Sequence, residues 1–160
     1  MRLYLMRHGK PVAEEVDPAR PLSDQGRSDV RKMAEFLKRV GINVSVIFHS
    51  GKTRAKETAE IVAATLGPHM QVEERSGVSP LDNVRRIADE IHTSRGDLFI
   101  AGHLPHLAKL TAFLVTADET IPVARFQEGG VFGKRRCWKV DDRLDVCARC
   151  SVSLPRRTLP

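Results

Sequence analysis

The sequence predicts an α/β protein with three layers, in which helices cover both faces of a mainly parallel sheet. Short apolar segments of strand length alternate along the chain with longer segments whose apolar residues recur at helical spacing. Strands that alternate with helices form parallel sheets that are buried on both faces. A chain of 160 residues is long enough for one domain with a substantial core, and we expect this domain to span residues 1–140.

The first half of the chain contains two strand segments that flank an amphipathic helix. Residues 2–6 read as a buried strand, followed by a polar loop that contains proline. Ser23 is a plausible N-cap for a helix from Asp24 to about Val40, with Gly41 as a natural stop. Residues 44–48 are rich in β-branched side chains and predict the second strand.

The second half continues the alternation. Ser50 can cap a helix that runs to about Leu66, and residues 70–73 predict a short third strand. A third helix is expected from about Asn83 to Ile91, a fourth strand over residues 98–101, and a fourth helix after Pro105.

The sequence predicts that two further strands close the fold. Residues 123–126 and 131–140 read as strands on either side of the turn at Gly129-Gly130. The pattern fades beyond Asp141, and we expect residues 141–160 to form a C-terminal extension that is partly mobile.

The basic composition favours an anionic partner. The formal net charge is +6, but the basic residues are scattered and aromatic residues are few, so a phosphorylated partner is favoured over nucleic acid. Local basic clusters occur at residues 134–136 and 156–157. No apolar run approaches the length of a membrane span, and the apolar start is too short for a signal-peptide core. We therefore expect a cytoplasmic protein with no membrane partner.

The three cysteines do not predict a metal centre. Cys147 and Cys150 have the spacing of a zinc pair, but a closed site needs four ligands, and neither a second pair nor a nearby histidine accompanies them. Together with Cys137 they are expected to be free thiols, because an odd number argues against a secreted disulfide scaffold. No cofactor is expected.

Three strand ends carry cationic or imidazole side chains. Arg7 and His8 follow the first strand, Arg54 lies in the first turn of the helix after the second, and His103 follows the fourth. The carboxyl ends of parallel strands are where ligands bind in open α/β sheets, and helix N-termini there attract anions. Together these features predict a phosphate pocket.

Each of these residues also has an ordinary explanation when it is taken alone. Arg54 could lie on a solvated helix face, His103 could be a core imidazole, and His8 could bind a metal. A metal would require carboxylates or more histidines nearby, whereas Lys10 and the arginines repel a cation. The joint occurrence of all three motifs in a suitable structural context favours the functional reading.

An imidazole at this position can attack a phosphoryl group. Neutral histidine is nucleophilic near neutral pH, and the neighbouring arginines are expected to lower the pKa of His8 and keep it neutral. Arg7, Arg54 and a protonated His103 could then stabilise the charge on the phosphoryl oxygens without a metal.

The motifs resemble those of the histidine phosphatase (phosphoglycerate mutase-like) superfamily. The matching pieces are Arg-His-Gly at 7–9, Ser-x-x-x-Arg-Ala-x-x-Thr-Ala at 50–59 and Gly-His-x-Pro at 102–105. The short length and the segment Arg-Pro-Leu-Ser-Asp-Gln-Gly at 20–26 look most like its SixA-type phosphohistidine phosphatase branch. The resemblance covers roughly residues 1 to 130.

The resemblance implies a role for each motif residue. It implies a phosphoglycerate mutase-like fold in which His8 becomes phosphorylated while Arg7, Arg54 and His103 bind the phosphoryl group. Arg20 is then expected at the pocket rim. Ser50 and Leu104, within the second and third motifs, are also assigned to substrate binding.

Two features depart from the superfamily pattern. Many members have Ser-Pro where this chain has Ser50-Gly51, a change that glycine should tolerate because it also permits a helix start. Larger members carry an acidic general acid in an insertion that is missing here. The nearby carboxylates are Glu73, Glu74 and Asp82, and Asp82 is either that acid or simply a helix N-cap.

The missing insertion bears on the substrate. Without a lid the pocket should be shallow and open, which suits a phosphoryl group presented on a protein surface. A phosphohistidine substrate would also tolerate the lack of an acid, since imidazole departs more readily than an alkoxide. A protein phosphohistidine phosphatase is therefore expected. The alternatives are a small-molecule phosphomonoesterase with the same residues and a phosphate-binding module without turnover.

Overall fold

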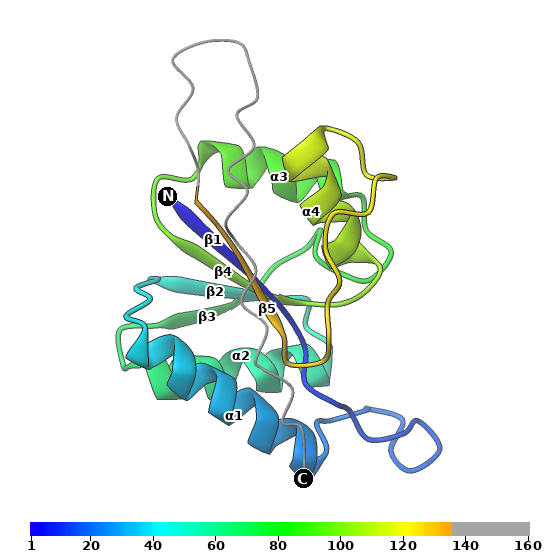
Figure 1. Ribbon diagram of the computed structural model, residues 1–160. Helices are drawn as coiled ribbons and strands as arrows, with labels where there is room; N and C mark the ends of the chain where they lie inside the picture. The colour runs from blue at the N-terminus through cyan, green and yellow to red at the C-terminus, as the bar shows by residue number, and fades with distance from the viewer. Residues whose placement is uncertain (136–160) are drawn as a thin grey trace, which may run out of the picture.

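The computed structural model describes residues 1–135, and these residues form the predicted alternation of strands and helices (Figure 1). In chain order the elements are β1 (Arg2–Arg7), α1 (Asp24–Arg39), β2 (Val46–His49), α2 (Thr53–Leu66), β3 (Gln71–Glu74), α3 (Val84–Thr93), β4 (Leu98–Gly102), α4 (His106–Thr116) and β5 (Val131–Arg135).

The strands of the described residues form one sheet in the order β3-β2-β4-β1-β5. Strands β3, β2, β4 and β1 run parallel to one another, whereas β5 runs antiparallel to β1. Figure 1 shows α1 and α2 on one face of the sheet and α3 and α4 on the other. The prediction of three layers around a mainly parallel sheet is therefore confirmed.

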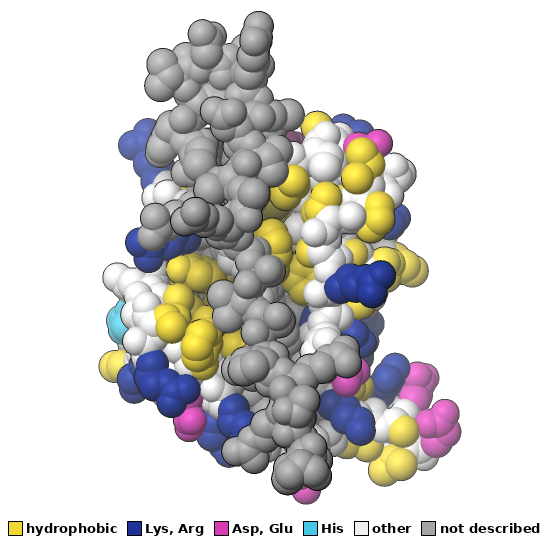
Figure 2. Space-filling model, viewed as in Figure 1, with side chains coloured by type: hydrophobic (Ala, Val, Ile, Leu, Met, Phe, Trp, Pro, Cys, Tyr) yellow, Lys and Arg dark blue, Asp and Glu magenta, His cyan; other side chains and the backbone are white. Residues whose placement is uncertain are grey.

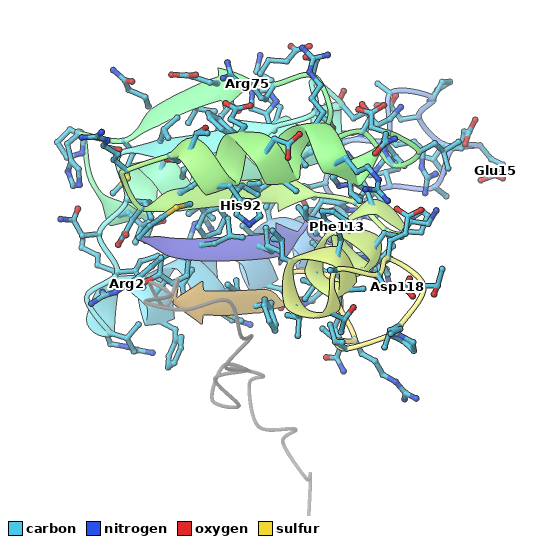
Figure 3. All side chains as sticks on the ribbon, turned by 90° about the horizontal axis from the view of Figure 1, so that it is seen from above. Arg2, Glu15, Arg75, His92, Phe113 and Asp118 are labelled. Atoms are coloured by element: carbon cyan, nitrogen blue, oxygen red, sulfur yellow. The ribbon has the colours of Figure 1, made fainter. Side chains whose placement is uncertain are left out.

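The register brings the functional motifs to one edge. Arg7 at the end of β1 pairs with Gly102 at the end of β4, and His49 at the end of β2 pairs with Ala101. Residues that follow these three strands therefore leave the sheet side by side. In Figure 3, Arg2 lies at the opposite end of β1 from the segment that carries Glu15, which extends beyond the carboxyl end of that strand.

Alternating side chains of the sheet pack into two separate apolar cores, one on each face. From β1, Met6 packs into the core beneath α1 and α2, whereas Leu3 and Leu5 pack into the core beneath α3 and α4. Phe99 and Ile100 of β4 divide in the same way, and both are fully buried. The two cores fix the sheet from both faces and thus hold its carboxyl edge in place.

The helix N-termini show which of the candidate capping residues, Ser23, Ser50 and Asp82, act as N-caps. Ser23 caps α1 as predicted, because its side chain accepts a hydrogen bond from the Gly26 N–H. The prediction that Ser50 caps the second helix is wrong, since α2 begins only at Thr53 with Lys52 as its N-cap. The N-cap of α3 is Asn83, not Asp82.

The prediction of a strand over residues 123–126 is also wrong. This segment is irregular, and the edge of β1 that it would need is taken by β5. Phe126 is nevertheless buried in the core beneath α3 and α4, and Ala124 packs against the same core, so two anchored side chains account for the apolar pattern there.

Part of the predicted C-terminal region lies outside the described residues. Lys134 and Arg135 belong to β5, whereas Arg136, the three cysteines, residues 137–140 of the predicted closing strand and the predicted extension over 141–160 lie beyond what the structure describes. In residues 1–135, no helix is long and apolar enough to span a membrane. Figure 2 shows Lys and Arg side chains dispersed over the visible face, interspersed with other types, as the scattered sequence pattern predicted.

Candidate functional site

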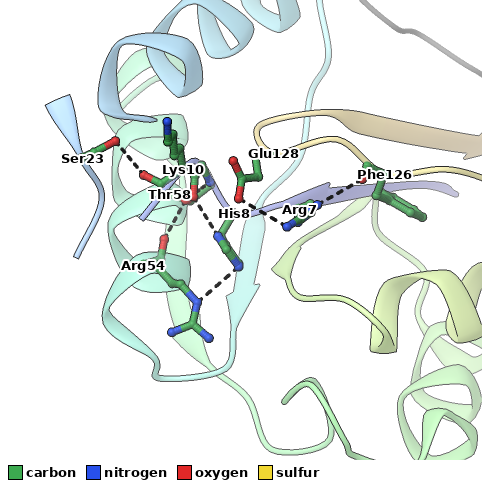
Figure 4. Close-up of polar contacts among 9 residues, drawn as sticks. Arg7, His8, Lys10, Ser23, Arg54, Thr58, Phe126 and Glu128 are labelled. Carbon is green, nitrogen blue, oxygen red and sulfur yellow. Dashed lines mark hydrogen bonds and ion pairs between the residues drawn. The ribbon is translucent and has the colours of Figure 1, made fainter. Parts of the chain in front are cut away.

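The candidate site lies where the ends of β1, β2 and β4 meet. His8 follows β1, Arg54 lies in the first turn of α2, and His103 follows β4. The rings of His8 and His103 are 5.0 Å apart between centroids. Three motifs that are distant in the sequence therefore converge on one place, as predicted. Figure 4 shows Arg7 and His8 of the first motif together with Arg54 of the second.

The hydrogen bonds of His8 define its tautomer. Nδ1 lies 2.8 Å from the Gly9 carbonyl oxygen, which can only accept, so Nδ1 carries the proton. Nε2 lies 3.2 Å from Nε of Arg54, which can only donate, so Nε2 carries a lone pair. The imidazole is thus neutral, with its basic nitrogen turned toward Arg54.

Burial is the main reason why His8 stays neutral. The residue is 7 % exposed, and its pKa is lowered from 6.5 to about 4, mainly by burial. The charges of Arg54, Arg7 and Arg20 contribute to this lowering, whereas the hydrogen bond to Gly9 opposes it. The predicted effect of the arginines is present but smaller than that of burial.

Gly9 is required by close packing rather than by a turn. A Cβ at this position would lie 2.6 Å from Cγ2 of Val30 and 2.9 Å from the Gly26 carbonyl oxygen. The Gly9 N–H also donates to the buried hydroxyl of Thr58 over 3.2 Å. The segment after β1 is therefore held tightly against α1 and α2, which fixes His8.

His103 is buried beside His8 and is paired with Ser50. Its Nε2 lies 2.6 Å from the Ser50 hydroxyl. Burial lowers the pKa of His103 to about 3, with smaller contributions from His8 and Arg54. His103 is therefore neutral in the ligand-free protein, because a charge there would be buried beside other cations. The expectation of a protonated His103 concerns the site with a phosphoryl group bound and stays a prediction. Its Nδ1 makes no hydrogen bond within the described residues.

Gly51 departs from the superfamily pattern for a reason that is visible in the structure. Its φ of +78° is incompatible with proline, and its N–H donates to Nδ1 of His49 over 3.0 Å. A Cβ on Gly51 would collide with the carboxylate of Glu74. Gly51 thus forms a turn before the helix instead of starting it, and this turn leaves Ser50 free to contact His103.

Arg7 makes contacts that the sequence did not predict. Its Nη2 pairs with the Glu128 carboxylate at 3.3 Å, and its Nη1 lies 3.4 Å from the Phe126 carbonyl oxygen. Figure 4 shows His8 between Arg54 on one side and Arg7 on the other. Glu128 could have been anticipated from topology, because a turn that precedes an antiparallel strand beside β1 must lie at the carboxyl end of β1.

Arg20 lies close enough to influence the site. Its charge lowers the pKa of both His8 and Arg54. It has a positive φ of 49° and pairs with Glu14 at 3.7 Å on the loop after β1. The expected place of Arg20 at the rim of a phosphate pocket stays a prediction.

Two of the predicted site residues do not present side chains to His8. Asp82 accepts a hydrogen bond from the Ser79 N–H at 2.8 Å, and its charge acts on His106 rather than on His8 or His103. The partly buried Leu104 side chain packs against the core beneath α3 and α4. Of the two glutamates named with Asp82, Glu74 lies against Gly51.

His106 is a buried polar residue that the sequence reading missed. It is fully buried at the start of α4, and neither ring nitrogen makes a hydrogen bond of ordinary geometry within residues 1–135. Burial lowers its pKa, against the nearby Asp82 charge and the Gly77 backbone, which raise it. Its place next to the Gly-His-x-Pro motif was the available signal.

Cations dominate this edge, and a metal centre is not apparent in the described part of the chain. No group of three or more His, Cys, Asp or Glu side chains within residues 1–135 could hold a metal ion. Arg7, Arg20, Arg54 and the N-terminus of α2 instead offer positive charge and hydrogen-bond donors. Such a set can bind the oxygens of a phosphoryl group.

Comparison with known proteins agrees with this chemistry. Residues 3–79 match the histidine phosphatase superfamily (branch 1). An uncharacterized protein of Picosynechococcus sp. is 31 % identical over 144 residues, which cover 84 % of this chain and 85 % of that protein. Phosphohistidine phosphatase SixA of Escherichia coli is 28 % identical over 123 residues, covering 74 % of this chain and 76 % of the relative.

The fold agrees with a solved structure of the same class. The protein histidine phosphatase SixA in complex with tungstate superposes with a TM-score of 0.74 at 23 % identity, over 83 % of this chain and 86 % of that one. The chain belongs to the histidine phosphatase superfamily, branch 1, and is a metal-independent phosphatase of that class.

Proposed function

We propose that this phosphatase removes phosphoryl groups from phosphohistidine in proteins, through a phosphorylated His8. The observation that carries the proposal is the tautomer of His8, in which Nδ1 donates to Gly9 and Nε2 holds a lone pair at the carboxyl edge of the sheet. This nitrogen is a nucleophile that needs no separate base.

The proposed reaction has two steps. In the first, Nε2 of His8 attacks phosphorus, and the P–N bond to the substrate imidazole breaks as that imidazole takes a proton from water. The hydroxide ion that this leaves is neutralised by the proton released in the second step. In the second, water attacks the phosphorus of phospho-His8, its P–N bond breaks, and inorganic phosphate leaves. Nε2 regains its lone pair, and the water proton passes to solvent or to the phosphate.

Arg54 changes partner during the first step. In the free protein its Nε donates to Nε2 of His8, the atom that must attack. An arriving phosphoryl oxygen is a stronger, anionic acceptor than a neutral imidazole, so the guanidinium would shift to it and release the lone pair. The nucleophile is thereby exposed only when a phosphoryl group is in place.

The remaining groups supply charge and orientation. Arg7 and Arg20 add positive charge, and the N-terminus of α2 adds oriented N–H groups. His103 is neutral in the free protein, but a phosphoryl dianion beside it would raise its pKa and allow it to donate a proton or a hydrogen bond. Ser50 holds the His103 ring in place through Nε2.

The lack of a general acid at the site, within the described residues, favours phosphohistidine over an alkyl phosphate ester as the substrate. Asp82 faces Ser79 and His106, and no carboxylate within the described residues contacts His8 or His103. A substrate with a poor leaving group would need such an acid, whereas imidazole departs more readily. The similarity to the Escherichia coli enzyme named for phosphohistidine supports the same substrate class.

A parallel assay tests the proposal. Phosphohistidine protein, phosphoramidate and a panel of alkyl phosphates should be compared with wild type, His8→Ala, and His92→Ala as a control histidine outside the site. We expect hydrolysis of the P–N substrates and a phosphoenzyme that is stable to alkali and absent in His8→Ala. A phosphoenzyme that persists in His8→Ala would refute the assignment. Turnover confined to esters would indicate a small-molecule phosphomonoesterase, and binding without turnover a phosphate-binding module.

A further inference from the structure

We propose that the Glu128 carboxylate occupies the position on Arg7 that the phosphoryl group takes when it binds. Because the carboxylate competes for Arg7, it weakens the binding of inorganic phosphate and so favours product release. This inference rests on the proposed function, because it assumes that Arg7 binds the transferred group. It concerns the same pocket but assigns a role to a residue on the turn before β5.

The contacts of Arg7 show which part of its guanidinium is occupied. Nη2 pairs with Oε1 of Glu128 at 3.3 Å, and Nη1 donates to the Phe126 carbonyl oxygen at 3.4 Å. Nε is buried and makes no hydrogen bond within residues 1–135. An oxyanion held bidentately by Nε and Nη2 would therefore take the place that the Glu128 carboxylate now occupies at Nη2.

Backbone hydrogen bonds fix Glu128 beside the candidate nucleophile. The N–H of Gly129 lies 3.0 Å from the Arg7 carbonyl oxygen and 3.2 Å from that of His8, and the Arg7 N–H donates to Gly130 at 3.2 Å. None of these bonds involves the side chain at position 128. The turn therefore holds the carboxylate at the pocket, and a substitution of that side chain leaves the turn intact.

The ion pair is weak enough to exchange with substrate. The Arg7 side chain is 26 % exposed and that of Glu128 is 37 % exposed, so water competes for both partners. A phosphoryl dianion carries more charge than a carboxylate and can bind through two oxygens, so it displaces Glu128. When phosphate is the product, the returning carboxylate competes with it and repels it.

Removal of the Glu128 charge should therefore tighten the binding of phosphate. For Glu128→Gln we expect about a 1.5- to fivefold lower dissociation constant for inorganic phosphate and for tungstate, the scale of a partly exposed ion pair. The KM for phosphoramidate should fall in parallel, without a loss of kcat that depends on the leaving group. Glu35→Gln, on the exposed face of α1, removes the same charge far along the helix from the site and should change neither constant.

Calorimetric titration of both oxyanions, combined with kinetics, separates the outcomes. In an Arg7→Ala background, Glu128→Gln should no longer tighten binding, because the competition requires Arg7. Unchanged or weaker phosphate binding by Glu128→Gln would overturn the inference while leaving the proposed function in place. A loss of kcat confined to alkyl phosphates would also overturn it, since Glu128 would then be a general acid. Wild type that binds neither oxyanion would remove the proposed function itself.

Discussion

Nε of Arg54 donates a hydrogen bond over 3.2 Å to Nε2 of His8, the ring nitrogen proposed to attack phosphorus. The same contact gives the lone pair a defined direction, and in the proposed mechanism it blocks the lone pair until an anion arrives. Arg54 reaches this position from the first turn of α2, where its own pKa is lowered by burial and by Arg20. The guanidinium is thus partly desolvated in the free protein, and in the proposed mechanism it gains an anionic partner when a phosphoryl group binds.

Replacement of either motif arginine should slow turnover without unfolding the protein. Arg54→Ala and Arg7→Ala should each reduce kcat/KM for phosphoramidate by roughly 10²–10³, the scale for loss of one transition-state donor. In Arg54→Ala the pKa of His8 should also rise, because a lowering charge is removed. Kinetics together with an NMR titration of the His8 ring measures both effects. Arg39→Ala, at the far end of α1, serves as the control.

The opposite result would identify a different role for these arginines. The Arg54→Ala protein could keep its activity, or its His8 pKa could stay unchanged. Either result would show that the contact between Arg54 and His8 in the free protein is unrelated to the reaction. A large change in the Arg39→Ala control would instead show that overall charge, and not position, governs the rate.

The buried histidines should make stability fall in mild acid. His8, His103 and His106 have lowered pKa values in the folded protein, with those of His8 and His103 at about 4 and about 3. The unfolded chain protonates these rings near pH 6.5, so it binds more protons than the folded state below that pH. Their stabilising contribution is complete above about pH 7.5. It is lost as the pH falls from 6.5 toward the folded values, by up to about 1.4 kcal/mol per pH unit for each proton.

Urea unfolding at pH 7.5, 6.0 and 5.0 measures this loss. His106→Leu should reduce the slope of stability against pH, because it removes one of these histidines without removing a hydrogen bond of ordinary geometry in the described residues. The exposed His92→Ala variant is the comparison. Equal stability at pH 7.5 and 5.0 would show that these rings are not neutral in the folded protein.

The predictability of the site from sequence depended on whether regular strands and helices position the interacting side chains. The alternation of elements and the helical spacing in α1 were sufficient to place His8, Arg54 and His103 at one edge. Their convergence follows from parallel register, which periodicity predicts. By contrast, Arg7 and Glu128 are 121 residues apart, and their pairing depends on how an irregular segment enters β5. No local pattern encodes such a contact.

A similar limit applies to Ser50. A serine before an amphipathic segment predicts an N-cap, and this preference is real for isolated helices. Here the hydroxyl bonds to His103, which lies 53 residues away, and the positive φ of Gly51 delays the helix to Thr53. A tertiary contact at the functional site therefore overrides the local preference.

Gly51 should be more sensitive to substitution than a glycine of similar backbone conformation elsewhere. Gly51 and Gly41 have φ values of +78° and +71°, so alanine costs about 1–2 kcal/mol at either position from backbone strain alone. Only at Gly51 would the new Cβ also meet a neighbour, the end of the flexible Glu74 side chain, which can move aside, whereas nothing lies within 4 Å at Gly41. We therefore expect similar destabilisation of both variants but a larger loss of activity in Gly51→Ala, because a shift of this turn moves Ser50 and the start of α2. Thermal unfolding and phosphoramidate kinetics of both variants test this. Equal effects on activity would show that the turn does not position the site.

The dependence of rate on the leaving group tests the interpretation of Asp82. Its carboxylate accepts from Ser79 and faces His106, so we expect it to organise the loop before α3 rather than to protonate a substrate. Rates should then depend steeply on leaving-group pKa, with phosphohistidine and phosphoramidate favoured over alkyl phosphates. Asp82→Asn should leave the hydrolysis of the P–N substrates almost unchanged, and its effect on esters should be equally small. If wild type hydrolyses alkyl phosphates well and Asp82→Asn loses activity only on them, Asp82 is the general acid and must approach His8 when substrate binds. The slope of rate against leaving-group pKa, measured for both proteins, distinguishes these outcomes. A general acid makes this slope shallow, so the slope should become steep in Asp82→Asn if Asp82 is the acid and should not change if it is not.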